Sequence, residues 1–133
     1  MSLVVTPPQL ALLLAPHRPL FIEEPLLHGH VNEIADIAKL TGVPIALGER
    51  FYTRQDLRPY LEAGAVDIIQ PDVSHAGGIS ECKRMADMAA AYDVSCAFHC
   101  PNGPIALAAS MHMDVALPNC ESRLVLATCH SSL

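Results

Sequence analysis

The segment Val66-Asp67-Ile68-Ile69-Gln70-Pro71-Asp72 decides the fold of this chain. Val66 to Ile69 has the apolar character of a buried β-strand, and it ends on a polar turn that carries a carboxylate. An amphipathic helix is predicted next, because apolar side chains recur at helical spacing from Ile79 to about Tyr92. A second apolar strand, Val94 to Phe98, then ends on His99. This order predicts a parallel strand-helix-strand unit.

The same alternation extends along the chain on both sides of this unit. Strands are also predicted over Leu20 to Glu23 and Val43 to Leu47. Helices are predicted over Gln9 to Ala15, from Val31 to a C-terminal Gly42, from a Thr53 N-cap to Gly64, and over Ile105 to His112. The chain therefore contains four consecutive strand-helix units, preceded by a helix.

Both doubly wound sheets and (β/α)8 barrels alternate strands and helices in this way. Each of the four strands ends on an ionisable residue, which is where barrel enzymes place catalytic groups. We therefore predict an α/β fold that is a partial (β/α)8 TIM-type barrel. A complete barrel has about 250 residues, so we expect residues 1–133 to form a single partial barrel domain that lacks the first strands.

Composition excludes several classes of protein. The chain has 8 Lys and Arg against 14 Asp and Glu, a formal net charge of -6, and no basic cluster, so a nucleic-acid partner is not expected. No apolar stretch approaches the roughly 18 to 20 residues that cross a membrane. No positive charge precedes the apolar part of the N-terminus, as a secretory signal would require. We expect a cytoplasmic protein without a membrane segment.

Cysteine usage indicates reduced thiols. The five cysteines are irregularly spaced, and no CxxC pair suggests structural zinc or a redox motif. A soft-metal cluster of Cys96, His99 and Cys100 is disfavoured, because Cys96 would point to the opposite side of a strand.

The four strand-end residues are Glu23, Glu49, Asp72 and His99, separated by 26, 23 and 27 residues. One strand-helix unit separates each pair, so in a parallel barrel these side chains converge at the mouth of one pocket. Glu23 and Glu49 offer the hard oxygen ligands that Mg²⁺ prefers, although a strand-end carboxylate can instead cap a helix N-terminus. His99 can act as a general base oriented by Asp72, although a single strand-end histidine is more often structural.

The remaining histidines carry less functional weight. We expect His28 and His30 to be solvated in a loop, and His112 to lie at a helix end.

These residues together resemble a known family. The chain is similar to the mandelate racemase branch of the enolase superfamily, and within it to acid-sugar dehydratases of the galactonate type, in the segments Ile22-Glu23-Glu24-Pro25, Gly48-Glu49-Arg50, Gln70-Pro71-Asp72-Val73-Ser74-His75-Ala76-Gly77-Gly78-Ile79, His99-Cys100-Pro101 and Gly103-Pro104-Ile105-Ala106-Leu107-Ala108. The resemblance covers residues 19–118.

The resemblance implies a function and a site. Glu23 and Glu49 would be two of the three Mg²⁺ ligands of the family, and Asp72 with His99 its catalytic dyad. Such an enzyme removes the proton α to a carboxylate, passes through an enediolate intermediate and, as a dehydratase, expels the β-hydroxyl of a sugar-acid substrate.

The chain also departs from the family pattern. The strand that carries the first metal-binding aspartate and a second acid/base residue is not found before Leu20, and neither is the N-terminal capping domain. The family has a further glutamate on the following strand, where this chain has Leu124, and Glu121 is out of register. Residues 120–133 look divergent. We therefore expect the isolated chain to be inactive.

Two alternatives remain open. A racemase or epimerase would use the same enediolate chemistry. A non-catalytic fragment could instead pair its open sheet edges and apolar inner face with another copy, which predicts a homo-oligomer.

Overall fold

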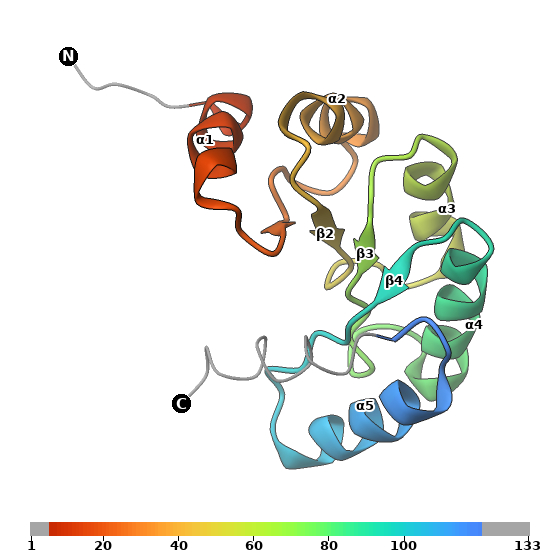
Figure 1. Ribbon diagram of the computed structural model, residues 1–133. Helices are drawn as coiled ribbons and strands as arrows, with labels where there is room; N and C mark the ends of the chain where they lie inside the picture. Colours follow the sequence, from red (N-terminus) through yellow and green to blue (C-terminus); the bar gives the residue numbers. More distant parts are fainter. Residues whose placement is uncertain (1–5, 121–133) are drawn as a thin grey trace.

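The computed structural model describes residues 6–120, and Figure 1 shows its sheet surrounded by an arc of helices. The strands are β1 (Ile22–Glu23), β2 (Ile45–Leu47), β3 (Ile68–Ile69) and β4 (Ser95–Cys96). The helices are α1 (Pro7–Leu14), α2 (Val31–Thr41), α3 (Arg54–Glu62), α4 (Gly78–Ala90) and α5 (Pro104–Ala116), with a 3-10 turn η1 (Ala15–His17) after α1. Within the described range, none of the helices is long and apolar enough to span a membrane.

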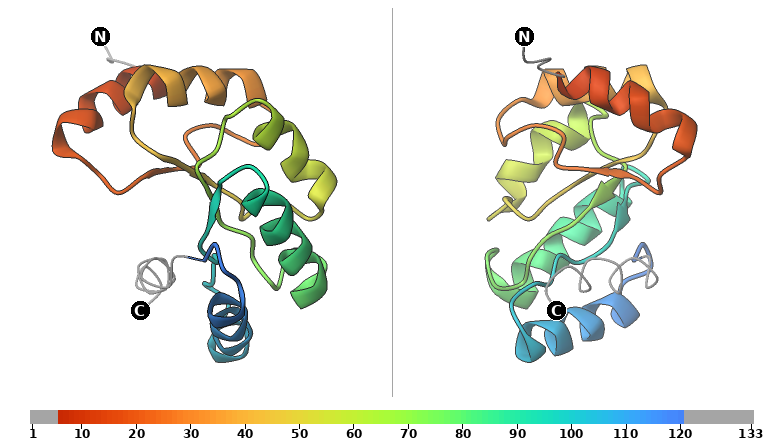
Figure 2. Two further views of the ribbon diagram at one scale, coloured as in Figure 1. Left: turned by 45° about the vertical axis from the view of Figure 1, so that its right-hand side comes forward. Right: turned by 90° about the vertical axis from the view of Figure 1, so that its left-hand side faces the viewer.

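The sheet is parallel and follows the order of the chain, β1-β2-β3-β4. Successive helices pack on one another outside it, and two further views show the same curved wall (Figure 2). A doubly wound sheet would have helices on both faces and a reversal of strand order. The predicted partial barrel is therefore confirmed.

Local sequence signals account for the helix ends. Gly42 ends α2 in the left-handed conformation (φ 61°), which an L-residue adopts only at a cost. Thr53 and Asp56 form a capping box at the start of α3. Pro59 lies inside α3, yet the helix continues to Glu62, and the carbonyl of Pro59 still accepts the Ala63 amide at 3.1 Å.

The strands are shorter than predicted, and the helix α5 is longer. Pro71 has no N–H to donate, so a continuous ladder cannot run through it. The pairing resumes one residue later, where Asp72 and His99 form an isolated parallel bridge. The bridge sets the backbones of these two residues side by side.

The main core lies between the sheet and the helices. Strand residues Ile45, Leu47 and Ile69 are buried there against Leu57 of α3 and Met85 of α4. Ala46, Ile68 and Ala97 form a second small cluster with Phe21. Alternation along the strands assigns this second cluster to the inner face of the barrel wall.

The chain returns to the sheet after α5. The side-chain amide of Asn119 donates to the carbonyls of Ala86 (3.1 Å) and Val94 (3.0 Å), and Cys120 forms a parallel bridge with Cys96. A fifth strand position therefore begins beside β4. The rest of the predicted divergent tail, including Glu121, Leu124 and Cys129, lies outside the described residues.

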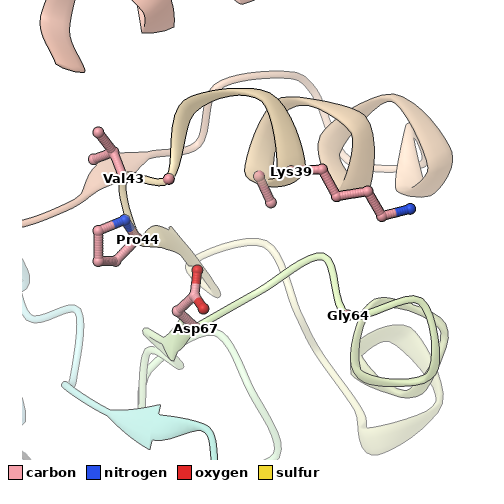
Figure 3. A pocket seen from close by; sticks show the side chains of 7 residues that line it. Lys39, Val43, Pro44, Gly64 and Asp67 are labelled. Carbon is pink, nitrogen blue, oxygen red and sulfur yellow. The ribbon is translucent and has the colours of Figure 1, made fainter.

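A hollow lined by Lys39, Val43, Pro44, Gly64 and Asp67 lies at the amino-terminal ends of β2 and β3, beside the end of α2 (Figure 3). The carboxylate of Asp67 accepts the backbone N–H of Ile45 at 2.8 Å, which ties the start of β3 to that of β2. This carboxylate therefore has a structural role, and the predicted chemistry lies at the opposite end of the sheet.

Candidate functional site

The site is built from the carboxyl ends of the four strands, which share one edge because the strands are parallel and in register. Glu23 is the last residue of β1, while Glu49, Asp72 and His99 follow β2, β3 and β4 within three residues.

Asp72 is the most enclosed member of the site, with a fully buried side chain. Its Oδ1 accepts the Ser74 N–H at 2.7 Å, and its Oδ2 accepts the Asn102 side-chain amide at 2.9 Å. Oδ2 also lies 2.9 Å from Nδ1 of His99. Burying a carboxylate is costly unless it is paired and hydrogen-bonded, and these contacts supply both.

His99 lies between two carboxylates. Its Nδ1 contacts Asp72, and its Nε2 is 3.1 Å from Oε2 of Glu49. The side chain is 17% exposed, so the imidazole is screened from water but still reachable at its rim. Because a carboxylate orients the ring through Nδ1, the other nitrogen is directed at the Glu49 side of the site. The structure thus brings three of the four predicted residues into direct contact.

Glu49 also has a cationic neighbour. Nε of Arg50 lies 3.4 Å from Oε1 of Glu49 and 3.9 Å from Oε2 of Glu24. Arg50 therefore stands between the carboxylates that follow β1 and β2.

Glu23 lies apart from this cluster. It is exposed on β1, the edge strand of the described sheet, and it pairs with Ala46. Since paired residues of neighbouring parallel strands share a face, Glu23 belongs to the inner face with Ala46 and Ile68. Within residues 6–120, no group of three or more His, Cys, Asp or Glu side chains is arranged to hold a metal ion.

Glu24 is a site residue that sequence reasoning did not identify. Its Oε1 accepts the Gly48 N–H at 3.0 Å, and burial is the main reason that its pKa is raised. Its position directly after the predicted ligand Glu23 could have suggested a role for Glu24, but only the structure shows where the Glu24 carboxylate lies.

Two further side chains complete the site. Asn102 contacts Asp72, as described above. Nδ1 of His75 lies 3.4 Å from the Glu49 carbonyl oxygen and 3.9 Å from Oδ2 of Asp72, and its ring centroid is 6.5 Å from that of His99. Each stands three residues after a predicted catalytic residue, and that spacing is the signal that could have identified them.

His28 and His30 lie where they were predicted, whereas His112 lies inside α5 and not at its end, because the helix continues to Ala116. His28 and His30 are exposed in the loop before α2, where His28 also contacts the rings of Phe51 and Tyr60. His112 lies in α5, and its Nδ1 is 2.7 Å from the Ala108 carbonyl of the preceding turn.

Cys82, Cys96 and Cys120 form no disulfide within the described range. Burial raises the pKa of Cys82 to about 12. The pKa of Cys96 is also raised, first by its hydrogen bond with Cys120 and then by burial. These thiols are therefore poor nucleophiles and poor metal ligands at neutral pH.

Asp72→Ala should lower the free energy of unfolding by about 2 kcal/mol or more, because it leaves buried donors without an acceptor. Asp87→Ala is the matched control, since Asp87 lies in an exposed ion pair with Lys83 at 2.7 Å and should contribute only about 0.5 kcal/mol. Urea unfolding monitored by circular dichroism measures both. Equal effects of the two substitutions would contradict the structural role of Asp72.

Comparison with known proteins places this geometry in a family. The family model described as enolase C-terminal domain-like matches residues 7–130. A D-galactonate dehydratase of Ralstonia pickettii (strain 12J) is 58% identical over 101 residues, which are 76% of this chain and 26% of the relative. The chain therefore spans about a quarter of that relative's length.

Solved structures agree with this similarity. An enolase from Agrobacterium radiobacter, a candidate galactarate dehydratase whose crystal structure contains Na and L-malate, is 39% identical with a TM-score of 0.82. A mandelate racemase/muconate lactonizing enzyme from Sulfitobacter sp. is 36% identical with a TM-score of 0.84. Each match covers 86% of this chain and 29% of the other chain. The chain belongs to the enolase C-terminal domain-like family.

Proposed function

We propose that this chain is part of a Mg²⁺-dependent acid-sugar dehydratase that acts on a galactonate-like substrate through an enediolate intermediate. The observation that carries the proposal is the continuous contact from Asp72 through His99 to Glu49, at 2.9 and 3.1 Å. It joins a base, its orienting carboxylate and a candidate metal ligand at one end of the sheet. The D-galactonate dehydratase relative supports the choice of substrate class.

The candidate ligands fit Mg²⁺ in chemistry and fall short in number. Glu23 and Glu49 are carboxylates from adjacent strands, and Mg²⁺ is commonly held by a few carboxylates together with water and substrate oxygens. No third protein ligand stands beside them in the part of the chain that the structure describes. When bound, the ion would stabilise the negative charge that develops on the carboxylate of the substrate.

The dyad would perform the proton transfer. Asp72 accepts a hydrogen bond from Nδ1 of His99, and so holds the ring with Nε2 directed at the site. Nε2 would take the α-proton, and Asp72 would stabilise the imidazolium that results. The Asn102 amide donates to the same carboxylate oxygen, which would keep the ring and carboxylate aligned during the transfer.

A racemase or epimerase remains the alternative reaction. It begins with the same proton abstraction, and the mandelate racemase-type neighbour from Sulfitobacter sp. favours keeping it. The two reactions differ in their second step, because a dehydratase loses the β-hydroxyl and a racemase returns a proton to the opposite face.

We place the protein in the cytoplasm, without a nucleic-acid partner. Reduced thiols such as those of Cys82, Cys96 and Cys120 are typical of reducing compartments, and the net charge of -6 opposes phosphate binding.

In the complete parent enzyme, His99→Asn should abolish exchange of the α-proton with solvent deuterium, because general-base catalysis contributes typically 10²- to 10⁴-fold. The Mg²⁺ affinity should stay within about threefold, because His99 is not one of the proposed Mg²⁺ ligands. NMR measures the exchange, and calorimetry measures the affinity. His112→Asn is the matched control, since His112 lies in α5 and bonds to its own helix. Exchange that persists in His99→Asn would show that another residue is the base.

The isolated chain should show no dehydration above background. Two carboxylates alone should bind Mg²⁺ weakly. Groups that position the substrate can together supply roughly 7 to 11 kcal/mol of the lowering of the activation barrier, so their loss should remove most of the rate. The measurement is an assay for 2-keto-3-deoxy products after incubation with Mg²⁺ and a panel of sugar acids. Turnover that His99→Asn removes would overturn this prediction and show that the partial barrel is a working enzyme.

The isolated chain should also form a homo-oligomer. The edge strand β1 pairs only with β2 in the described sheet, and exposed apolar side chains lie near both ends of the wall: Leu13 is 63%, Leu20 73%, Ile105 85% and Val115 88% exposed. Sedimentation velocity measures the state, and Leu20→Glu with Val115→Glu should shift it toward monomer. A monodisperse wild-type monomer would contradict the prediction.

A further inference from the structure

The turn after β2 carries Glu49, and three backbone contacts fix its position. The N–H of Gly48 donates to Glu24 at 3.0 Å, and the carbonyl of Gly48 accepts the Phe51 N–H at 3.0 Å. A Cβ at Gly48 would lie 2.3 Å from backbone atoms of Gln70, so β2 approaches β3 there more closely than a side chain allows. The peptide groups on both sides of Gly48 are therefore held.

The first of these contacts comes from a residue in an unusual conformation. Glu24 leaves β1 with φ 44°, in the left-handed region that residues other than glycine rarely adopt. Strained backbone of this kind persists only where surrounding contacts hold it, and it gathers at functional sites. The Glu24 side chain is only 15% exposed, and its other oxygen lies 3.9 Å from Nε of Arg50, which is 3.4 Å from the Glu49 carboxylate.

Glu24 therefore reaches Glu49 by two routes. One route runs through the backbone, because the Gly48 amide precedes Glu49 directly. The other runs through Arg50, which contacts both carboxylates. A carboxylate that already accepts an amide and shares a guanidinium is less available to a metal ion than the exposed carboxylate of Glu23.

We propose that Glu24 is a positioning residue, which accepts the Gly48 N–H and holds Arg50 so that the Glu49 carboxylate is oriented toward His99 and the cation of the site. The proposal rests on the proposed function only in naming Glu49 as a metal ligand. It gives the two adjacent glutamates different roles, in which Glu23 would bind the cation and Glu24 would hold the turn that carries Glu49.

The test uses the full chain labelled with ¹⁵N, Mn²⁺ as a paramagnetic probe, and the variants Glu24→Ala and Glu24→Gln. Glu62→Ala is the matched control, because Glu62 forms an exposed pair with Arg58 at 3.3 Å within α3. Two readouts are measured: hydrogen exchange of the Gly48 amide by NMR, and Mn²⁺ affinity from the electron paramagnetic resonance signal of the free ion.

Glu24→Ala should speed exchange of the Gly48 amide at least tenfold and weaken Mn²⁺ binding by about 10- to 100-fold, the usual effect of losing a residue that orients a ligand. Glu24→Gln keeps an oxygen that can accept the Gly48 N–H, so it should restore most of the exchange protection and only part of the affinity. Glu62→Ala should change neither readout.

The outcomes separate this proposal from the proposed function. Wild-type exchange at Gly48 in Glu24→Ala would overturn the bracing role, and so would unchanged Mn²⁺ affinity beside faster exchange. If wild-type chain bound no Mn²⁺, the proposed metal site would fail for this chain, whereas the exchange of the Gly48 amide and the NMR chemical shift of the Glu49 amide would still decide whether Glu24 orients this turn.

Discussion

The arrangement of the site depends on one buried carboxylate, that of Asp72. Its hydrogen bonds reach the turn that leads to α4, the side chain of His99 after β4, and the Asn102 amide before α5. Burying a carboxylate without such partners would cost several kcal/mol of folding free energy. Each of these segments is therefore held at the position where its donor can hydrogen-bond to the Asp72 carboxylate. The loop after β3 also folds back at this residue, since the amides of His75 and Ala76 donate to the backbone carbonyl of Asp72.

The neighbouring strand end is controlled by close backbone approach. Gly48 packs against the backbone of Gln70, and this leaves no room for a side chain between β2 and β3. The consequence for chemistry is that the Glu49 backbone stands beside the dyad, with its carbonyl facing His75 and its carboxylate facing His99. Tight backbone packing and a buried charge together make the two central strand ends the most firmly defined part of the site.

The edge of the sheet is different in character. β1 has a neighbour on one side only within the described residues, and Glu23 is exposed there. Glu23 is exposed and Glu49 contacts His99 because of where their strands lie in the sheet: an edge strand offers fewer neighbours that can fix a side chain. In the D-galactonate dehydratase relative, the matched residues make up 26% of the chain.

The sequence by itself determined the alternation of strands and helices, the partial barrel and the four strand-end residues. Apolar strands, helical spacing and cap residues such as Thr53 and Gly42 are local signals, and parallel strands then bring their carboxyl ends to one edge. Only the tertiary structure decided which of these residues touch. The contact of His99 with Glu49, the hydrogen bond from Gly48 to Glu24 and the short strands interrupted at Pro71 depend on the separation of neighbouring backbones and on where a buried charge finds its donors. These are properties of the packed sheet, and they cannot be predicted from the spacing of residues along the chain.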